Sequence, residues 1–255
     1  MPTSAGALAL AESYAPRDAP LVRWLRQAGA IILGKTNMTE LANYMTTGMP
    51  GGYSSLGGQV RNAHHPDLAV AGSSSGSAVA VAAELCSVAI GTETSGSILR
   101  PAEMSGIVGI KPTVGLVSRP GIVPISFSQD TAGPFARSVE DAALMLNVLA
   151  GYDPKDFSSV DVPPPSLTVP PNVVPPRIGV LCGFFEENSS EEVRTHTIEI
   201  VERLKRAGAE ITRVDLPTRF DTLLAAHRVV MTVELAAVHE ANFTEKPDQF
   251  GPGIR

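Results

Sequence analysis

Two clusters of serine and glycine flank one apolar segment of the chain, and their residue types could carry acyl-transfer chemistry. The first runs from Ala71 to Ser77 (AGSSSGS), and the second runs from Thr94 to Ser97 (TSGS). A nucleophilic serine needs an exposed hydroxyl, a neighbouring base and N–H donors for the oxyanion. Glycine beside serine permits the tight turn that exposes a hydroxyl and lets successive N–H groups converge. The clusters therefore predict a nucleophile site, although glycine and serine are also common in plain loops.

The segment after the first cluster separates these two interpretations. A flexible linker would not lead at once into SAVAVAAEL, whose small apolar residues predict a helix buried against a sheet. Free N–H groups at the N-terminus of such a helix suit a catalytic or anion-binding turn. The usual base would be histidine, but His64 and His65 precede Pro66 in a turn, and the other three histidines fall in helical segments. Ser–Lys variants of the catalytic triad make a different base admissible.

Hydrophobic periodicity predicts alternating helices and strands around these clusters. The unbroken apolar run AIIL at 30–33 predicts a buried strand, and Ser138 is a candidate N-cap for a helix at 139–150. The order helix–AGA–strand occurs at 19–33 and again at 191–214, which indicates an α/β layer fold with largely parallel strands. The expected helices cover 19–28, 76–85, 139–150, 190–207 and 221–240, and the expected strands cover 30–33, 87–90, 107–110, 177–182 and 209–214.

Composition excludes several classes of protein. The 255 residues are 44% hydrophobic and 18% charged with a net charge of −6, which is typical of a globular protein with one large or two small domains. No basic stripe exists, so we expect no nucleic-acid ligand. The histidines and cysteines show no metal-ligand spacing, so we propose no metal. No targeting segment or bilayer-length apolar run occurs, which predicts no membrane partner and a cytoplasmic location.

Longer ordered motifs resemble the amidase signature family. They are AGSSSGSAVAVAA from Ala71, GTETSGSILRPA from Gly91 and GIVGIKPTVGLVSRPGIVPISFSQDTAGP from Gly106, with AGAIILGKTNMTELAN upstream from Ala28. The GTET and SFSQDTAGP segments are most similar to the peptide amidase branch. The resemblance covers nearly the whole chain and is strongest over residues 29–154.

The resemblance implies a fold and a division of the chain. The expected fold is α/β, with a mixed, largely parallel central sheet covered by helices, and it is incomplete because the family pattern is truncated at both ends. Residues 1–161 would form the signature core without its N-terminal lysine segment. A proline-rich linker would follow at 162–176, and 177–255 would form a second α/β portion of the same domain, incomplete at its C-terminus.

The family uses a Ser–cis-Ser–Lys triad, which the resemblance carries onto named residues. Ser97 matches the nucleophile, and Ser73 matches the bridging serine that the family holds in a cis peptide bond. The implied reaction is hydrolysis of a small amide or peptide amide through an acyl-enzyme, with Ser73 relaying the proton and no cofactor. Oxyanion or substrate-binding roles are implied for Thr94, Ser95, Gly96, Ser74 and Ala42, and Ser74 would also support Ser73 by a hydrogen bond. Two positions depart from the family, because many members have Asp at Glu93 and Gly at Ser95.

The lysine of the triad is expected to be missing from this chain. In the family it lies on a strand upstream of the motifs above, and MPTSAGALAL matches the family just after it. Lys35 follows a predicted strand and is a tempting substitute, but family members carry both lysines, which favours a structural role. Lys111 also matches a structural segment, and the remaining lysines fall in the linker or on polar faces.

Three functions stay open from the sequence. The first is an amidase, and the second is a non-catalytic amidase remnant that acts as a binding module. The third is an A-type amidotransferase subunit, which shares the same core, although the similarity to peptide amidases counts against it. Labelling of Ser97 by a fluorophosphonate would separate the first two.

Overall fold

The computed structural model describes residues 1–43, 48–163, 174–217 and 220–250. The chain divides into two compact units, one made of residues 1–167 and 230–255 and the other of residues 168–229. The first unit contains both serine clusters. Of the predicted linker at 162–176, residues 164–173 lie outside the described residues.

The first unit is built on a three-stranded sheet in the order β3 (Val88–Glu93), β5 (Thr131–Ala136), β4 (Val108–Gly109). Strand β5 is central and all of its residues are buried. It pairs antiparallel with both neighbours, so that Ala136 lies opposite Val88 on one side and Val108 on the other.

This pairing corrects the prediction of largely parallel strands. Strands β3 and β4 run in the same direction and are joined through helix α3 (Leu99–Ser105), but β5 lies between them in the opposite direction. The parallel pair among the described strands is β6 (Arg177–Leu181) with β7 (Glu210–Val214), in the second unit. The α/β class with mixed strand directions is confirmed.

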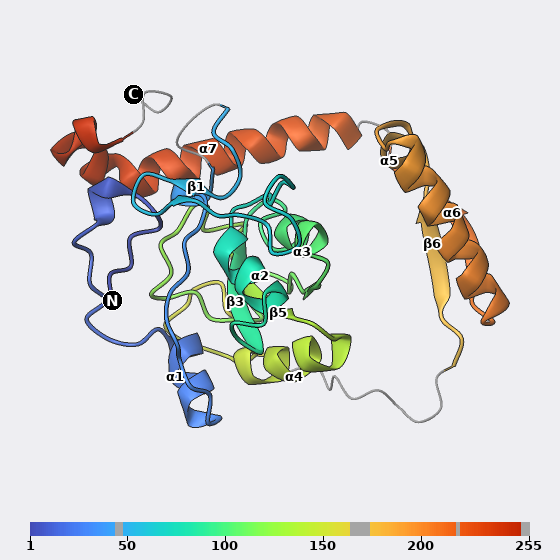
Figure 1. Cartoon of the computed structure of the whole chain (residues 1–255), viewed down its shortest axis with the longest axis horizontal. Coiled ribbons are helices and arrows are strands. Elements are labelled where there is room, and N and C mark those ends of the chain that lie inside the picture. Colours follow the sequence, from blue (N-terminus) through green and yellow to red (C-terminus); the bar gives the residue numbers. More distant parts are fainter. Residues whose placement is uncertain (44–47, 164–173, 218–219, 251–255) are drawn as a thin grey trace. The chain divides into compact units, whose positions relative to one another are not determined.

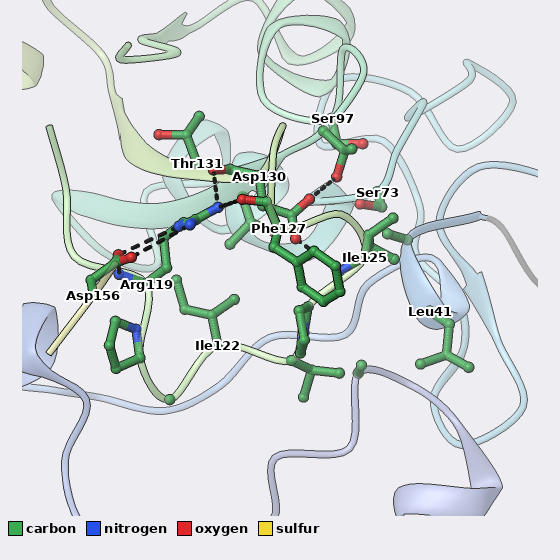
Figure 2. A pocket seen from close by; sticks show the side chains of 18 of the residues that line it. Leu41, Ser73, Ser97, Arg119, Ile122, Ile125, Phe127, Asp130, Thr131 and Asp156 are labelled. Carbon is green, nitrogen blue, oxygen red and sulfur yellow. Dashed lines mark hydrogen bonds and ion pairs between the residues drawn. The ribbon is translucent and has the colours of Figure 1, made fainter. Parts of the chain in front are cut away.

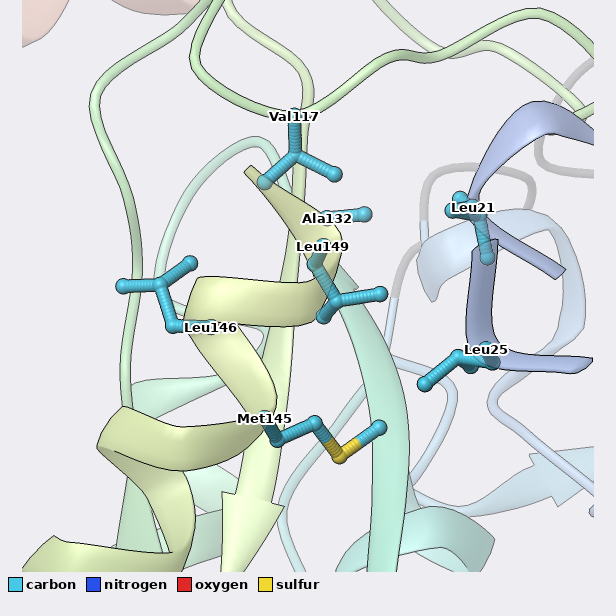
Figure 3. Close-up of a cluster of buried hydrophobic side chains, with 7 residues drawn as sticks. All are labelled: Leu21, Leu25, Val117, Ala132, Met145, Leu146 and Leu149. Atoms are coloured by element: carbon cyan, nitrogen blue, oxygen red, sulfur yellow. The ribbon is translucent and has the colours of Figure 1, made fainter. Parts of the chain in front are cut away.

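Helices cover both faces of the three-stranded sheet. Ala132 and Phe135 are three positions apart along β5, so their side chains face opposite sides of the strand. Ala132 joins a buried cluster with residues of α1 (Pro20–Gln27) and α4 (Val139–Leu149), which Figure 3 shows. The Ser138 hydroxyl accepts from Asp141 N at 3.0 Å and caps α4 as predicted.

Phe135 packs on the other face with α2 (Ser75–Ala82) and α3. The two helices α2 and α4 lie beside β3 and β5 in Figure 1. No residue of α2 is exposed, as its small side chains predict. A Cβ on Gly91 of β3 would lie 2.4 Å from the Phe135 ring, so this close approach requires glycine.

The predicted buried strand at 30–33 is wrong. These residues have no strand structure, and the side chains of Ile31 and Leu33 are 84% and 72% exposed. Ile32, in contrast, packs on the cluster between α1 and α4. No described strand pairs with this segment, so its backbone groups join no ladder.

The second unit contains β6 and β7, joined by α5 (Phe184–Glu187) and α6 (Glu191–Arg206). Helix α7 (Phe220–Glu245) begins in this unit and continues into the first from residue 230.

All predicted helices are found, and the predicted strands other than 30–33 are found as β3, β4, β6 and β7. The remaining elements are the short strands β1 (Tyr53–Ser54) and β2 (Gly58–Gln59) and 3₁₀ helices at Leu8–Leu10, Glu40–Asn43 and Pro247–Gln249. Among the described helices, none combines the length and apolar character that a membrane span requires.

Candidate active site

The first serine cluster forms the loop that enters α2. Its Gly72–Ser73 peptide bond is cis, as the resemblance implied. The Ser73 carbonyl accepts from Thr39 N at 3.0 Å, and the Ser75 hydroxyl donates to the Ala71 carbonyl at 2.8 Å. A Cβ on Gly72 would lie 2.2 Å from Thr39 Oγ1, so the packing around this bond leaves no room for a side chain.

The second cluster forms the turn between β3 and α3. Glu93 is 4% exposed, and its Oε2 accepts from Ile98 N at 2.7 Å and from Leu99 N at 3.0 Å. The carboxylate thus reaches across the turn to the free N–H groups at the start of α3, where a negative charge is favoured. Gly96 has φ of +83°, which a residue with a side chain rarely adopts. Together these features hold Ser97 just before the N-terminus of α3.

Ser74 joins the two clusters. Its hydroxyl donates to the Thr92 carbonyl at 3.0 Å and accepts from Thr92 N at 3.1 Å, and its own N–H donates to the Ser97 carbonyl at 3.2 Å. The side chain therefore bonds to β3 and not to Ser73, which the resemblance had suggested as its partner.

The two candidate catalytic serines line one cavity of about 260 Å³ (Figure 2). Ser73 is 1% exposed, and its Oγ has no hydrogen-bond partner among the described residues. Ser97 is 9% exposed. Thr94 and Ala42 line the same cavity, whereas the other candidate residues, Ser74, Ser95 and Gly96, belong to the two loops but do not line it.

Ala42 reaches the cavity through an unusual turn. Leu41, Ala42 and Asn43 have φ values of 40°, 59° and 70°, which are uncommon for residues other than glycine. Leu41 is 1% exposed, and its N–H donates to the Ala5 carbonyl at 2.9 Å. Buried packing thus holds the turn whose Ala42 lines the cavity.

Asp130 connects the second cluster to the segment at residues 125–126. Its Oδ1 accepts from Thr94 Oγ1 at 2.5 Å, and its Oδ2 accepts from Ile125 N and Ser126 N at 2.8 and 2.9 Å. This residue was not among those expected from the sequence. The SFSQDTAGP motif contains it, but nothing in the motif alone shows that its carboxylate accepts from two separate segments.

Arg119 and Asp156 form an ion pair that also lines the cavity, with 3.4 Å between Nη2 and Oδ1. Burial acts to raise the pKa of Asp156, but hydrogen bonds from Ser158 and Arg119 outweigh it and hold the pKa below its usual value. Asp156 therefore stays ionised beside the guanidinium. Sequence reasoning missed both residues, because the pair forms only when the loops at 119 and 156 meet.

Side chains of α7 in the first unit form hydrogen bonds with the segment at residues 124–128. The Glu234 carboxylate of α7 accepts from the hydroxyls of Ser126 and Ser128, and His239 Nε2 lies 3.1 Å from the Pro124 carbonyl. Burial acts to raise the pKa of Glu234, but the serine hydrogen bonds and Arg119 outweigh it and lower the pKa. Burial lowers the pKa of His239, so its ring is neutral at pH 7.

The lysines of the chain occupy different surroundings. Lys35 Nζ bonds to Thr3 Oγ1 and lies 3.2 Å from the Pro2 carbonyl, and it does not line the cavity. Lys111 Nζ donates to the Pro112 carbonyl at 3.2 Å and is also outside the cavity lining. Lys155 is exposed and does line the cavity, which its place in a predicted polar segment had not indicated.

The cavity brings two serine side chains to the surface that a bound molecule would contact. The described residues contain no group of three or more His, Cys, Asp or Glu side chains placed to hold a metal ion. A buried hydroxyl that has no partner in the described part of the chain and lines the same cavity as a second serine is free to receive and pass on a proton.

Comparison with known proteins gives consistent matches. A sequence model described as Amidase matches residues 1–250. The A-type subunit of glutamyl-tRNA(Gln) amidotransferase from Salinibacter ruber is 42% identical over 239 residues, which cover 92% of this chain and 45% of that protein. A probable amidase of Arabidopsis thaliana is 49% identical over 154 residues, or 60% of this chain and 30% of that protein.

Solved structures show the same similarity in three dimensions. The native peptide amidase from Stenotrophomonas maltophilia has a TM-score of 0.82 and 46% sequence identity, over 96% of this chain and 51% of that one. The A-type subunit of glutamyl-tRNA(Gln) amidotransferase from Thermotoga maritima has a TM-score of 0.82 and 30% identity, over 93% and 51% of the two chains. The chain spans about half the length of the curated relatives it matches.

Proposed function

The chain belongs to the amidase family, and on that premise we propose that it carries the nucleophile and substrate pocket of an enzyme that hydrolyses carboxamides. One observation carries the proposal: Ser97 and the buried, unpartnered hydroxyl of Ser73 line the same cavity, beside a cis Gly72–Ser73 bond. The expected substrate is a small amide or peptide amide. The chain spans about half the length of its curated relatives, so the hydrolytic activity of the whole protein is also proposed here.

In the proposed reaction, Ser97 Oγ attacks the amide carbonyl carbon and its proton passes to Ser73. N–H groups of the turn formed by Thr94, Ser95 and Gly96 receive the negative charge on the carbonyl oxygen. The C–N bond then breaks, and the amine leaves with the relayed proton. Water hydrolyses the acyl ester on Ser97, which restores the serine and releases the carboxylic acid.

The base of the family triad is a lysine for which we expect no counterpart in this chain. Loss of a general base typically costs about 10²–10⁴-fold in rate. We therefore expect the 255-residue chain to acylate slowly while its nucleophile and turn remain in place. The cytoplasmic location stays a prediction.

Two alternatives to direct hydrolysis remain, an amidotransferase subunit and a non-catalytic binding module. Curated relatives named as the A-type subunit of glutamyl-tRNA(Gln) amidotransferase are 42–43% identical to the chain, which favours a role in delivering ammonia to a partner enzyme. The 46% identity to the solved peptide amidase favours direct hydrolysis. A non-catalytic binding module would retain the cavity but form no acyl-enzyme.

Covalent labelling tests the proposal. We expect a fluorophosphonate to add one phosphonyl group to the chain, with loss of fluoride, and peptide mass spectrometry to locate it on Ser97. The Ser97→Ala variant should not be labelled, and Ser73→Ala should be labelled at least tenfold more slowly. Ser87 is exposed and outside the cavity lining, so Ser87→Ala is the matched control and should label like the wild type. An unlabelled Ser97 in the folded chain would refute the nucleophile assignment.

A further inference from the structure

The loop at residues 125–130 is held by charged side chains from three separate places. Asp130 accepts from the N–H groups at its start. Arg119 Nη1 donates to the carbonyl of Phe127 at 2.6 Å, and Glu234 Oε2 accepts from Ser128 N at 3.2 Å. Charge-assisted hydrogen bonds are stronger than neutral ones, so this loop is fixed from both ends and at its middle.

This loop presents Phe127 to the cavity. The residue lines the cavity, and Figure 2 shows its ring among the side chains that line it. The side chain is 38% exposed, so part of its ring is free to contact a ligand. Because the backbone on both sides is bonded, the point from which the ring projects is held in place before a ligand binds.

The charges in the cavity lining are largely paired within the protein. Arg119 is paired with Asp156, and their side chains are only 11% and 3% exposed. Both carboxylate oxygens of Asp130 already accept hydrogen bonds. These groups have little capacity left for a charged substrate, whereas the cavity lining also includes the apolar side chains of Leu41, Ile122, Ile125 and Phe127. Lys155 is the exception, but it is exposed, so its ammonium group can stay hydrated at the edge.

We propose that Phe127 determines the acyl specificity of this site and selects amides with an uncharged, apolar acyl group large enough to contact its ring. The proposal rests on the proposed function only in taking the cavity as the acyl site. An arylalkyl group would bury apolar area against Phe127, whereas the methyl group of acetamide is too small to gain this contact.

Binding to the Ser97→Ala variant tests this without any turnover. Three ligands are titrated by calorimetry or NMR: 4-phenylbutanamide, acetamide and succinamate, whose acyl group ends in a carboxylate. We expect 4-phenylbutanamide to bind most tightly. Adding Phe127→Ala should weaken its binding about 5–20-fold, as expected for loss of an aromatic contact, and should change acetamide binding less than twofold.

Two controls make the result decisive. Tyr152 is 50% exposed and outside the cavity lining, so Tyr152→Ala should leave all three affinities unchanged. Phe127→Leu keeps an apolar side chain and should retain most of the affinity for 4-phenylbutanamide, which excludes misfolding as the cause. Equal weakening of both neutral amides by Phe127→Ala, or tighter binding of succinamate, would overturn the proposal. Failure of Ser97 labelling would refute the nucleophile while leaving this binding result intact.

Discussion

Replacement of Glu93 by alanine should destabilise the first unit and slow the labelling of Ser97. Both effects should be larger than those of replacing an exposed carboxylate. The carboxylate accepts from Ile98 N and Leu99 N, and the Ile98 residue is completely buried. A hydrogen bond to a charged acceptor contributes about 1.5–3 kcal/mol. Loss of both bonds should therefore lower the free energy of unfolding by about 3–6 kcal/mol, out of a total of about 5–15 kcal/mol for a typical domain.

The chain contains one tryptophan, Trp24 in α1, so its fluorescence reports the unfolding of the first unit. In urea, a loss of this size should lower the unfolding midpoint of Glu93→Ala by roughly 1–2 M. Glu93→Gln keeps an acceptor oxygen and should lose only about 1–2 kcal/mol, because the remaining bonds become neutral. The rate of fluorophosphonate labelling should fall in the same order, since the turn that ends at Ser97 loses its anchor.

Glu103 provides the matched control, because it is an exposed carboxylate on the same helix α3. Glu103→Ala should change the free energy of unfolding by no more than about 0.5 kcal/mol. If Glu93→Ala unfolds at the same urea concentration as Glu103→Ala, the Glu93 carboxylate does not anchor the turn and the reasoning fails.

Two further predictions concern the serine loop and the pocket wall. Gly72→Ala would place a Cβ 2.2 Å from Thr39 Oγ1, so we expect a loss of about 1–3 kcal/mol by Trp24 fluorescence and at least tenfold slower labelling of Ser97; wild-type labelling would contradict this. Burial lowers the pKa of His239, so the unfolded state binds a proton that the folded state excludes, and stability should fall as the pH drops below about 6.5. His239→Gln should reduce this fall between pH 8 and 5.5, and an unchanged pH dependence would count against it.

Much of the local structure follows from the sequence because it depends on near neighbours. Ser138 caps α4 through a residue only three positions away, and the small side chains after Ser74 both form α2 and allow it to be buried. The two serine clusters also predict their own turns, since glycine at Gly96 permits the positive φ that the second turn adopts. Pairing of the clusters in one site was an expectation from family resemblance, and the lining of a single cavity includes both Ser73 and Ser97.

Tertiary structure alone decided which strands meet and which charges line the cavity. Pro134 and Gly133 give β5 the composition of a loop, yet this strand is the central one of its sheet. The Pro134 carbonyl still accepts a hydrogen bond from Ile110 N. Glycine is needed at 133, because a Cβ there would lie only 2.0 Å from the Ile110 carbonyl. The run at 30–33 has the opposite character: its side chains are typical of a strand, but no described strand pairs with it. Glu234 bonds to Ser126 across 108 positions of sequence. Periodicity and spacing report only neighbours along the chain, so contacts between distant segments, which shape this pocket, appear only when the chain is folded.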